Sequence, residues 1–117
     1  MAVTVDNKQL NVISLKENFE VIHTSYEEIR EAELKRYVKV YGVKRQWEIS
    51  AVEQNVSWTE SILKYLQDKA AAGSLVTLKV EETDYNVEAS VYVVEASLNE
   101  FDPKNKIKYF TVTFMEQ

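Results

Sequence analysis

The chain has 117 residues, with 14 basic and 19 acidic side chains and a formal net charge of −5. This length predicts one domain, and an apolar fraction of 45% predicts a folded protein and not a disordered one. The negative charge argues against a dedicated nucleic-acid binder, and the lack of cysteine excludes disulfides, thiolate metal sites and cysteine nucleophiles.

The first third of the chain has weak patterns. Residues 9–15 and 18–22 are candidate short strands, because their apolar residues alternate imperfectly. The opening residues show neither a basic segment nor an apolar run, so we expect no signal peptide and no membrane contact, and synthesis and folding in a cytoplasm. We interpret residues 1–34 as an N-terminal arm or as peripheral strands, and residues 35–117 as a β-rich core.

Residues 25–33 have some marks of a short helix. Ser25 and Glu28 fit a capping box, in which each side chain bonds the backbone at the other position. Only Ile29 and Ala32 would give this helix an apolar stripe, and a nine-residue helix that buries so little is marginal alone. The segment is therefore either a short helix or an arm that becomes ordered on assembly.

Two strand patterns follow, separated by a single glycine. Residues 35–41 alternate cleanly between their two faces, and residues 45–51 place Trp47 and Ile49 on one face. Gly42 between them allows a turn, a bulge or a bend. The two runs form either a hairpin or one long bent strand.

A helix is predicted over residues 58–72. Ser57 and Glu60 form a second capping-box pattern, and Gly73 is placed to adopt the left-handed conformation that ends helices. One face of this helix is apolar, formed by Trp58, Ile62, Leu63, Tyr65, Leu66 and Ala70.

The rest of the chain alternates as strands. Residues 76–80 form one strand, residues 81–84 a polar turn, and residues 85–93 a long strand whose apolar phase shifts at Val94. Such a shift predicts a β-bulge. Residues 109–115 close the pattern, so we predict an α+β fold. It consists mainly of an antiparallel β sheet or split barrel with one principal helix.

The charges are segregated along the chain. Residues 34–47 hold five basic and no acidic side chains, and residues 80–103 hold seven acidic and no basic ones. These are either solvated surfaces that pair within one molecule or complementary faces that meet between subunits. The candidate contacts between subunits are Lys35, Arg36, Lys39, Lys44, Arg45, Glu81, Glu82, Asp84 and Glu88.

Residues that could support catalysis are sparse. His23 is the only histidine, and the acidic run 81–84 lacks the glycine and ligand spacing of a calcium loop. Glu48 and Glu95 could face each other as a glycosidase pair, and the Lys35–Tyr41 face resembles a single-strand nucleic-acid platform. Ordinary structural roles suit all of these better, so we expect no catalytic residue, no metal, no cofactor and no enzyme activity.

The order of these elements resembles the small β-rich tube, distal-tail and baseplate subunits of tailed-bacteriophage tails. The resemblance covers about two-thirds of the chain and rests on five segments, and it leaves the first 35 residues unmatched. The segments are VKRQWEI at 43–49, the helix at 57–72, GSLVTL at 73–78, YNVEASVYVV at 85–94 and KYFTVTFME at 108–116.

This resemblance implies a structural role. Such subunits stack as rings around a lumen through which DNA passes, so it implies copies of the chain itself and neighbouring tail or baseplate proteins as partners. It also implies location in a virion, after synthesis in the host cytoplasm. The alternative from another class is a soluble adaptor or peptide-binding module that uses an exposed sheet edge.

Overall fold

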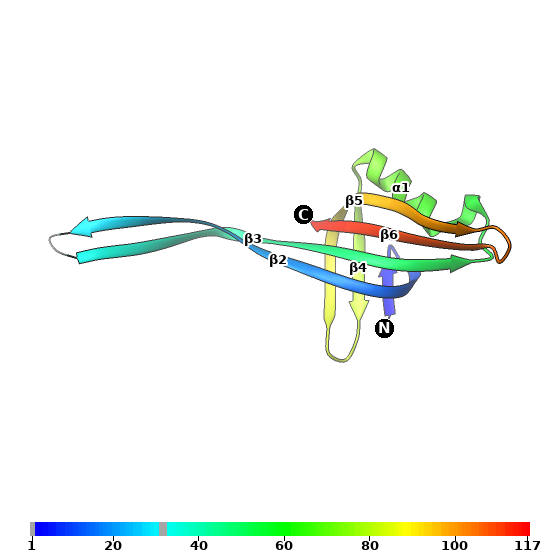
Figure 1. The fold of residues 1–117 in the computed structure, drawn as a ribbon, viewed down its shortest axis with the longest axis horizontal. Coiled ribbons are helices and arrows are strands. Elements are labelled where there is room, and N and C mark those ends of the chain that lie inside the picture. Colours follow the sequence, from blue (N-terminus) through cyan, green and yellow to red (C-terminus); the bar gives the residue numbers. More distant parts are fainter. Residues whose placement is uncertain (1, 31–32) are drawn as a thin grey trace.

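The computed structural model describes the backbone of residues 2–30 and 33–117, and side chains for residues 2–21 and 43–117. Within these ranges the chain forms six strands, a short 3-10 helix and one α-helix (Figure 1). The strands are β1 (Ala2–Val5), β2 (Lys8–Arg30), β3 (Glu33–Gln54), β4 (Leu75–Glu81), β5 (Asn86–Asp102) and β6 (Ile107–Glu116). The helices are η1 (Trp58–Glu60) and α1 (Ile62–Ala72).

The six strands close into an antiparallel barrel in the order β1-β2-β3-β6-β5-β4. The predicted α+β class with one principal helix is therefore confirmed, but the barrel is closed and not split. Closure depends on β1, which pairs with β2 on one side and with β4 on the other. Alternation in this short strand turns Val3 and Val5 inward, where both are fully buried.

The N-terminal residues belong to this barrel. Val3, Val5 and Leu10 all lie in the hydrophobic core, so this part of the chain is neither an arm nor peripheral. Of the two interpretations of residues 25–33, the short helix is wrong for residues 25–30, which lie in β2 and pair with β3. Residues 31–32 lie outside the described residues. The capping pattern of Ser25 and Glu28 is outweighed by antiparallel pairing of this segment with residues 33–38.

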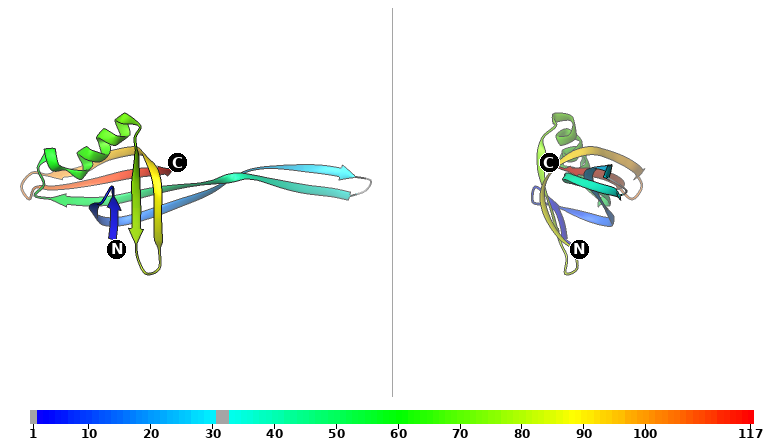
Figure 2. Two further views of the ribbon diagram at one scale, coloured as in Figure 1. Left: turned by 180° about the vertical axis from the view of Figure 1, so that it is seen from behind. Right: turned by 90° about the vertical axis from the view of Figure 1, so that its left-hand side faces the viewer.

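β2 and β3 extend far beyond the barrel as one paired hairpin (Figures 1 and 2). The molecule measures 73 × 33 × 23 Å and has a radius of gyration of 19.3 Å. A compact domain of this size would have a radius of gyration of about 13 Å. The shape is therefore set by the hairpin, which projects along the longest axis.

Bulges mark the points where the long strands change phase. β3 is one continuous strand, and a register shift opposite Ile22 and His23 leaves Tyr41 as an extra residue beside Gly42. A second shift, between Val93 and Glu95, leaves Val94 without a partner position on β6. The predicted bulge at Val94 is thus confirmed, and of the two readings of 35–51 the long bent strand is correct.

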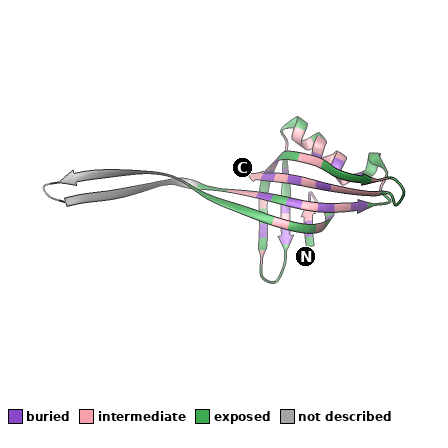
Figure 3. Ribbon diagram, viewed as in Figure 1, coloured by how far each residue is buried: buried purple, intermediate pink, exposed green. Residues whose placement is uncertain are grey.

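The core lies inside the barrel (Figure 3). Trp47, Phe110 and Phe114 are its largest fully buried side chains, contributed by the neighbouring strands β3 and β6. β-branched and aliphatic residues of β1, β4 and β5 complete it from the other side. Inward residues of every strand thus contact one apolar interior, as expected for a small closed barrel.

The helix begins four residues later than predicted. α1 spans Ile62–Ala72 and is preceded by η1. The Ser57 side chain makes no capping hydrogen bond to the backbone. The expected capping box is therefore wrong. Gly73 does end the helix, with φ of 65°, and its backbone N–H donates to the carbonyls of α1, so that prediction is confirmed.

The N-terminus of α1 is instead held by Glu53 at the end of β3. Its carboxylate accepts hydrogen bonds from the Ile62 and Leu63 backbone N–H groups at 2.6 and 3.1 Å, and from the Ser61 hydroxyl at 2.8 Å. Glu53 is 6% exposed, and the Lys108 amine lies 3.8 Å away. A negative charge at a helix N-terminus satisfies free N–H groups and complements the helix dipole. This long-range contact fixes α1 to the barrel.

Leu66 provides a test of how firmly α1 is packed. It is fully buried, together with Leu63, in the barrel core. Leu66→Ala should lower the free energy of unfolding by about 2–5 kcal/mol, because it leaves a cavity in a close-packed interior. Denaturant titration measures this loss. A midpoint equal to that of the parent protein would show that α1 lies loosely on the barrel.

Tyr65 connects α1 to the turn between β1 and β2. Its hydroxyl donates to the Asp6 carboxylate at 2.6 Å, and the other oxygen of Asp6 accepts from the Thr77 backbone N–H at 2.8 Å. This hydrogen bond, followed by burial, raises the pKa of Tyr65 to about 12. The stabilisation is therefore fully present below the ordinary tyrosine pKa of about 10 and is lost as pH rises through about 12.

The Tyr65→Phe variant isolates the contribution of Tyr65 to the pH dependence of stability. The parent should lose more stability than the variant between about pH 10 and 12, because only the parent has this phenol to ionise. Denaturant midpoints of both proteins over that range, with ultraviolet detection of tyrosinate, provide the measurement. Parallel stability curves for the two proteins would show that the Tyr65–Asp6 contact does not form in solution.

Candidate assembly surfaces

The projecting hairpin has unpaired edges. Among the described strands, β2 beyond Leu10 pairs only with β3, and β3 before Gln46 pairs only with β2. Each strand of the hairpin therefore presents a row of backbone N–H and C=O groups on its outer side. Long open edges of this kind are templates for pairing with another chain.

One face of the hairpin continues the inner face of the barrel. The register sets Phe19 opposite Arg45, two residues from buried Trp47, and sets Val21 opposite Val43. Phe19 is 55% exposed and Val43 is 52% exposed, although the same face is buried inside the barrel. An apolar surface thus emerges from the barrel and is half-exposed among the side chains that the structure describes.

A polar cluster closes the end of the barrel from which the hairpin leaves. Arg45 forms an ion pair with Glu116, and its guanidinium lies 5.1 Å from the Trp47 ring centre. Trp47 Nε1 donates to the Tyr85 hydroxyl at 2.9 Å. The hydrogen bond with Glu116 raises the pKa of Arg45, and burial raises the pKa of Tyr85. Both pKa shifts favour the ordinary protonation state at neutral pH, so this cluster joins β3, β6 and the start of β5 at this end of the barrel through polar contacts.

The five basic residues proposed as subunit contacts lie on β3, and three of them are opposite acids of β2. The register pairs Lys35 with Glu28, Arg36 with Glu27 and Lys44 with Glu20. The side chains of Lys35, Arg36 and Lys39 lie outside the described residues, while Arg45 is engaged by Glu116 within the chain.

The acidic residues proposed as contacts lie on the β4–β5 hairpin. Glu81 forms an ion pair with Lys79 at 2.8 Å, and Glu88 lies opposite Lys79 in the register. Glu82 and Asp84 are exposed in the turn between the two strands, which projects to one side of the barrel, away from the β2–β3 hairpin (Figures 1 and 2). The ion pairs of Arg45 and Glu81 are made with residues outside the two predicted charged segments, while Trp47 of the basic segment donates a hydrogen bond to Tyr85 of the acidic segment.

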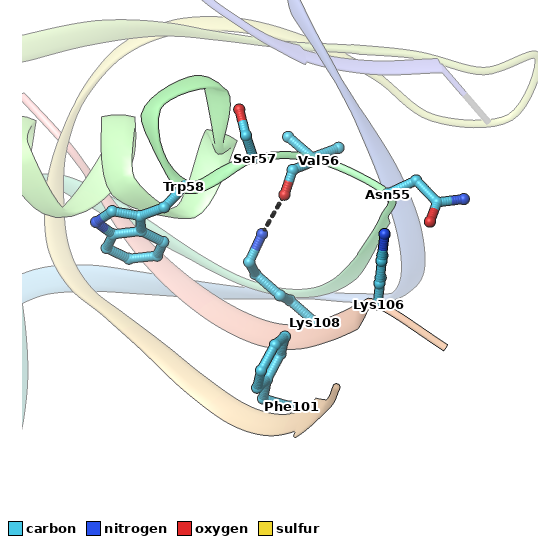
Figure 4. Close-up of a pocket in the computed structure, with 7 residues that line it drawn as sticks. All are labelled: Asn55, Val56, Ser57, Trp58, Phe101, Lys106 and Lys108. Atoms are coloured by element: carbon cyan, nitrogen blue, oxygen red, sulfur yellow. Dashed lines mark hydrogen bonds between the residues drawn. The ribbon is translucent and has the colours of Figure 1, made fainter. Parts of the chain in front are cut away.

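A groove lies at the opposite end of the barrel from the β2–β3 hairpin. It has a volume of about 450 Å³ and is lined by Asn55, Val56, Ser57, Trp58, Phe101, Lys106 and Lys108 (Figure 4). Trp58 is 48% exposed and Phe101 is 51% exposed.

Two hydrogen bonds tie the walls of this groove together. The Asn55 backbone N–H donates to the Lys106 carbonyl at 2.9 Å, and Lys108 Nζ donates to the Val56 carbonyl at 2.7 Å (Figure 4). Asn55 and Lys106 both have positive φ, of 58° and 55°. The two walls of the groove are thus held together by contacts within the subunit.

Two of the other sites considered from sequence, His23 and the Lys35–Tyr41 face, have side chains outside the described part of the chain. The described part contains no group of three or more His, Cys, Asp or Glu side chains that could hold a metal ion. Glu48 and Glu95 flank Thr113 on exposed outer positions of the barrel, without the apolar setting that a glycosidase acid requires. No helix in the described residues is long and apolar enough to cross a membrane.

No known protein family matches the sequence, and no curated protein matches it. The fold does have a counterpart among solved structures. It is similar to a chain of a structure described as the virion of a native gene transfer agent particle, with a TM-score of 0.67 and 6% sequence identity. The match covers 99% of this chain and 89% of that one. This likeness establishes a shared fold.

The sequence patterns missed the groove and its support. The sequence pattern places Trp58 on the apolar face of the helix, whereas its ring is half-exposed in η1, and it assigns no role to Phe101. One signal was available: Lys104, Lys106 and Lys108 alternate in five residues directly after the acidic segment. Glu53, which positions the helix beside the groove, gives no local signal because its partners lie up to ten residues away.

Proposed function

We propose that this protein is a non-enzymatic structural subunit of a phage-like virion. It assembles with copies of itself into a ring of the tail, in the tube, distal-tail or baseplate region. The observation that carries the proposal is the projecting β2–β3 hairpin, whose two strand edges and apolar face have no cover within the described chain. The shared fold with a chain of a gene transfer agent virion supports the same conclusion.

The two edges of the hairpin suit a head-to-tail contact between neighbours. In the projecting part of the hairpin β2 is mainly acidic, with Glu17, Glu20, Glu27 and Glu28 against Arg30, and β3 is mainly basic, with Lys35, Arg36, Lys39, Lys44 and Arg45 against Glu33. An acidic edge of one copy therefore meets a basic edge of the next. Such a heterologous interface, in which two different patches meet, generates a ring when the rotation closes.

The overall charge suits a ring that DNA passes through without binding. A net charge of −5 gives little neutralisation of phosphates, and charge repulsion keeps a duplex mobile. The partners of the subunit are then its own copies and neighbouring tail or baseplate proteins. It is located in the virion after synthesis in the host cytoplasm.

The same open edges favour one alternative, a soluble adaptor that captures an extended peptide as an added strand. The two functions differ in what occupies the edge. A virion subunit uses both hairpin edges against its own copies, whereas an adaptor uses one edge against a different chain and stays monomeric.

Negative-stain electron microscopy of the purified full chain at high concentration tests the proposal, together with light scattering over a range of salt. We expect closed rings or stacked tubes, and a lower assembled fraction as salt screens the charged edges. A monomer at every concentration, also in the presence of virion proteins, would refute the virion role and favour the adaptor.

A further inference from the structure

We propose that the Trp58–Phe101 groove receives the β4–β5 turn of a second copy of this chain. This inference rests on the proposed virion function and adds the contact by which one ring or subunit docks on the next. The occupant is the acidic turn at residues 82–84, and the groove supplies a basic, aromatic receptor for it.

The groove is basic where a ligand would enter. Lys106 lines it and Lys104 is exposed beside it in the β5–β6 turn, while the described residues that line the groove include no carboxylate. The nearby Asp102 carboxylate is turned into its own loop, where it accepts hydrogen bonds from the Lys104 and Asn105 backbone N–H groups at 3.1 and 3.3 Å. Two lysine ammonium groups are thus available to an acidic partner.

The floor of the groove is apolar. The half-exposed rings of Trp58 and Phe101 provide a surface for the aliphatic parts of an inserted turn, and aromatic anchors of this kind dominate interface energies. The loop at 55–57 is held by backbone hydrogen bonds to Lys106 and by Lys108. A preformed groove loses little conformational entropy on binding.

The β4–β5 turn has the complementary chemistry. Asp84 is exposed at its tip, and Glu82 and Thr83 precede it. The turn projects below the barrel, whereas the groove lies at the end of the barrel (Figures 1 and 2). Since the two surfaces face different directions, they meet only between copies, which makes the contact heterologous.

A charge-swap experiment tests this contact. The turn variant carries Thr83→Lys and Asp84→Lys, and the groove variant carries Lys104→Glu and Lys106→Glu, all at exposed positions that leave the core unchanged. Each variant alone places like charges on both sides of the contact, and we expect the concentration needed for stacking to rise by about tenfold or more at low salt. An equimolar mixture should restore stacking, because each altered surface then finds an opposite charge on the other variant.

A disulfide experiment gives an answer even if stacking is weak. The chain has no cysteine, so Thr83→Cys in one protein and Ser57→Cys in another introduce single thiols on the turn and the groove. Under mild oxidation the mixed pair should form a heterodimer in excess over a control pair of Thr83→Cys with Asp68→Cys, an exposed helix position that does not line the groove. Disulfides require Cα atoms within about 7 Å, so only a true contact gives this excess.

The outcomes separate this inference from the virion proposal. Rings that form normally with both charge variants, and no excess heterodimer, would overturn the groove contact and leave the ring intact. Restored stacking in the mixture, or the heterodimer without rings, supports the groove contact. A monomeric parent that shows no excess heterodimer would overturn both.

Discussion

Glu53→Ala is expected to lower the free energy of unfolding by about 3–5 kcal/mol, the usual cost of breaking a buried charge network. The substitution removes the acceptor of two backbone N–H groups and of the Ser61 hydroxyl. It also leaves the Lys108 amine, on a side chain 12% exposed, without its nearest carboxylate. Chemical denaturation measures the loss, and it should exceed that of most surface substitutions severalfold.

Two further variants make this result specific. Glu53→Gln keeps the shape of the side chain and one acceptor oxygen. Its free energy of unfolding should therefore fall by less than that of the alanine variant. Ser57→Ala removes the hydroxyl that the sequence pattern assigned as the helix cap, and it should change stability by about 0.5 kcal/mol or less because the surface hydroxyl contacts only Thr59. A larger loss at Ser57 than at Glu53 would show that the helix begins where the sequence pattern placed it.

Features with a local physical cause were predictable from the sequence. Gly73 had to end the helix, because its backbone has the left-handed conformation that side chains disfavour. The apolar phase shift at Val94 corresponds to a real bulge, because a strand that buries one face must gain a residue to change phase. Neither inference needed knowledge of the rest of the fold.

Features that depend on distant partners were not predictable. Val3 and Val5 sit in a four-residue strand whose role becomes clear only when β4 lies beside it and closes the barrel. The helix cap comes from Glu53 because the end of β3 runs beneath α1, while the closer capping pattern at Ser57 and Glu60 remains unused. Local patterns identify residues that are able to cap a helix or to form a strand, and tertiary packing determines which of those residues do so.

The charge pattern also depends on the fold as well as on the local sequence. The segregation of basic and acidic segments along the chain suggested two faces that meet between subunits. The structure places acids of β2 opposite bases of β3 within one hairpin, so part of that pattern is satisfied by register alone. The acidic turn at residues 82–84 and the exposed Lys104 and Lys106 lie outside this hairpin and form a second pair of oppositely charged surfaces.

Removal of the projecting hairpin should abolish ring assembly and leave the barrel folded. Val21 and Val43 are directly paired, so the two strands can be joined there by an Asn-Gly turn that replaces residues 22–42. Every pairing of β3 with β6 and every core residue identified in the barrel lies outside the removed segment. We therefore expect the stability of the barrel to be retained while sedimentation and electron microscopy detect monomers only.

A matched variant separates the strand edges from the apolar face. Phe19→Ser with Val43→Ser keeps the full hairpin and its backbone edges but removes two large apolar groups that are half-exposed. If both surfaces contribute, this variant should assemble more weakly than the parent, whereas the shortened protein should not assemble at all. Rings formed by the shortened protein would show that assembly uses other surfaces of the barrel. The hairpin would then be free to bind a different chain, as the adaptor function requires, because its open edges and exposed apolar face still need cover.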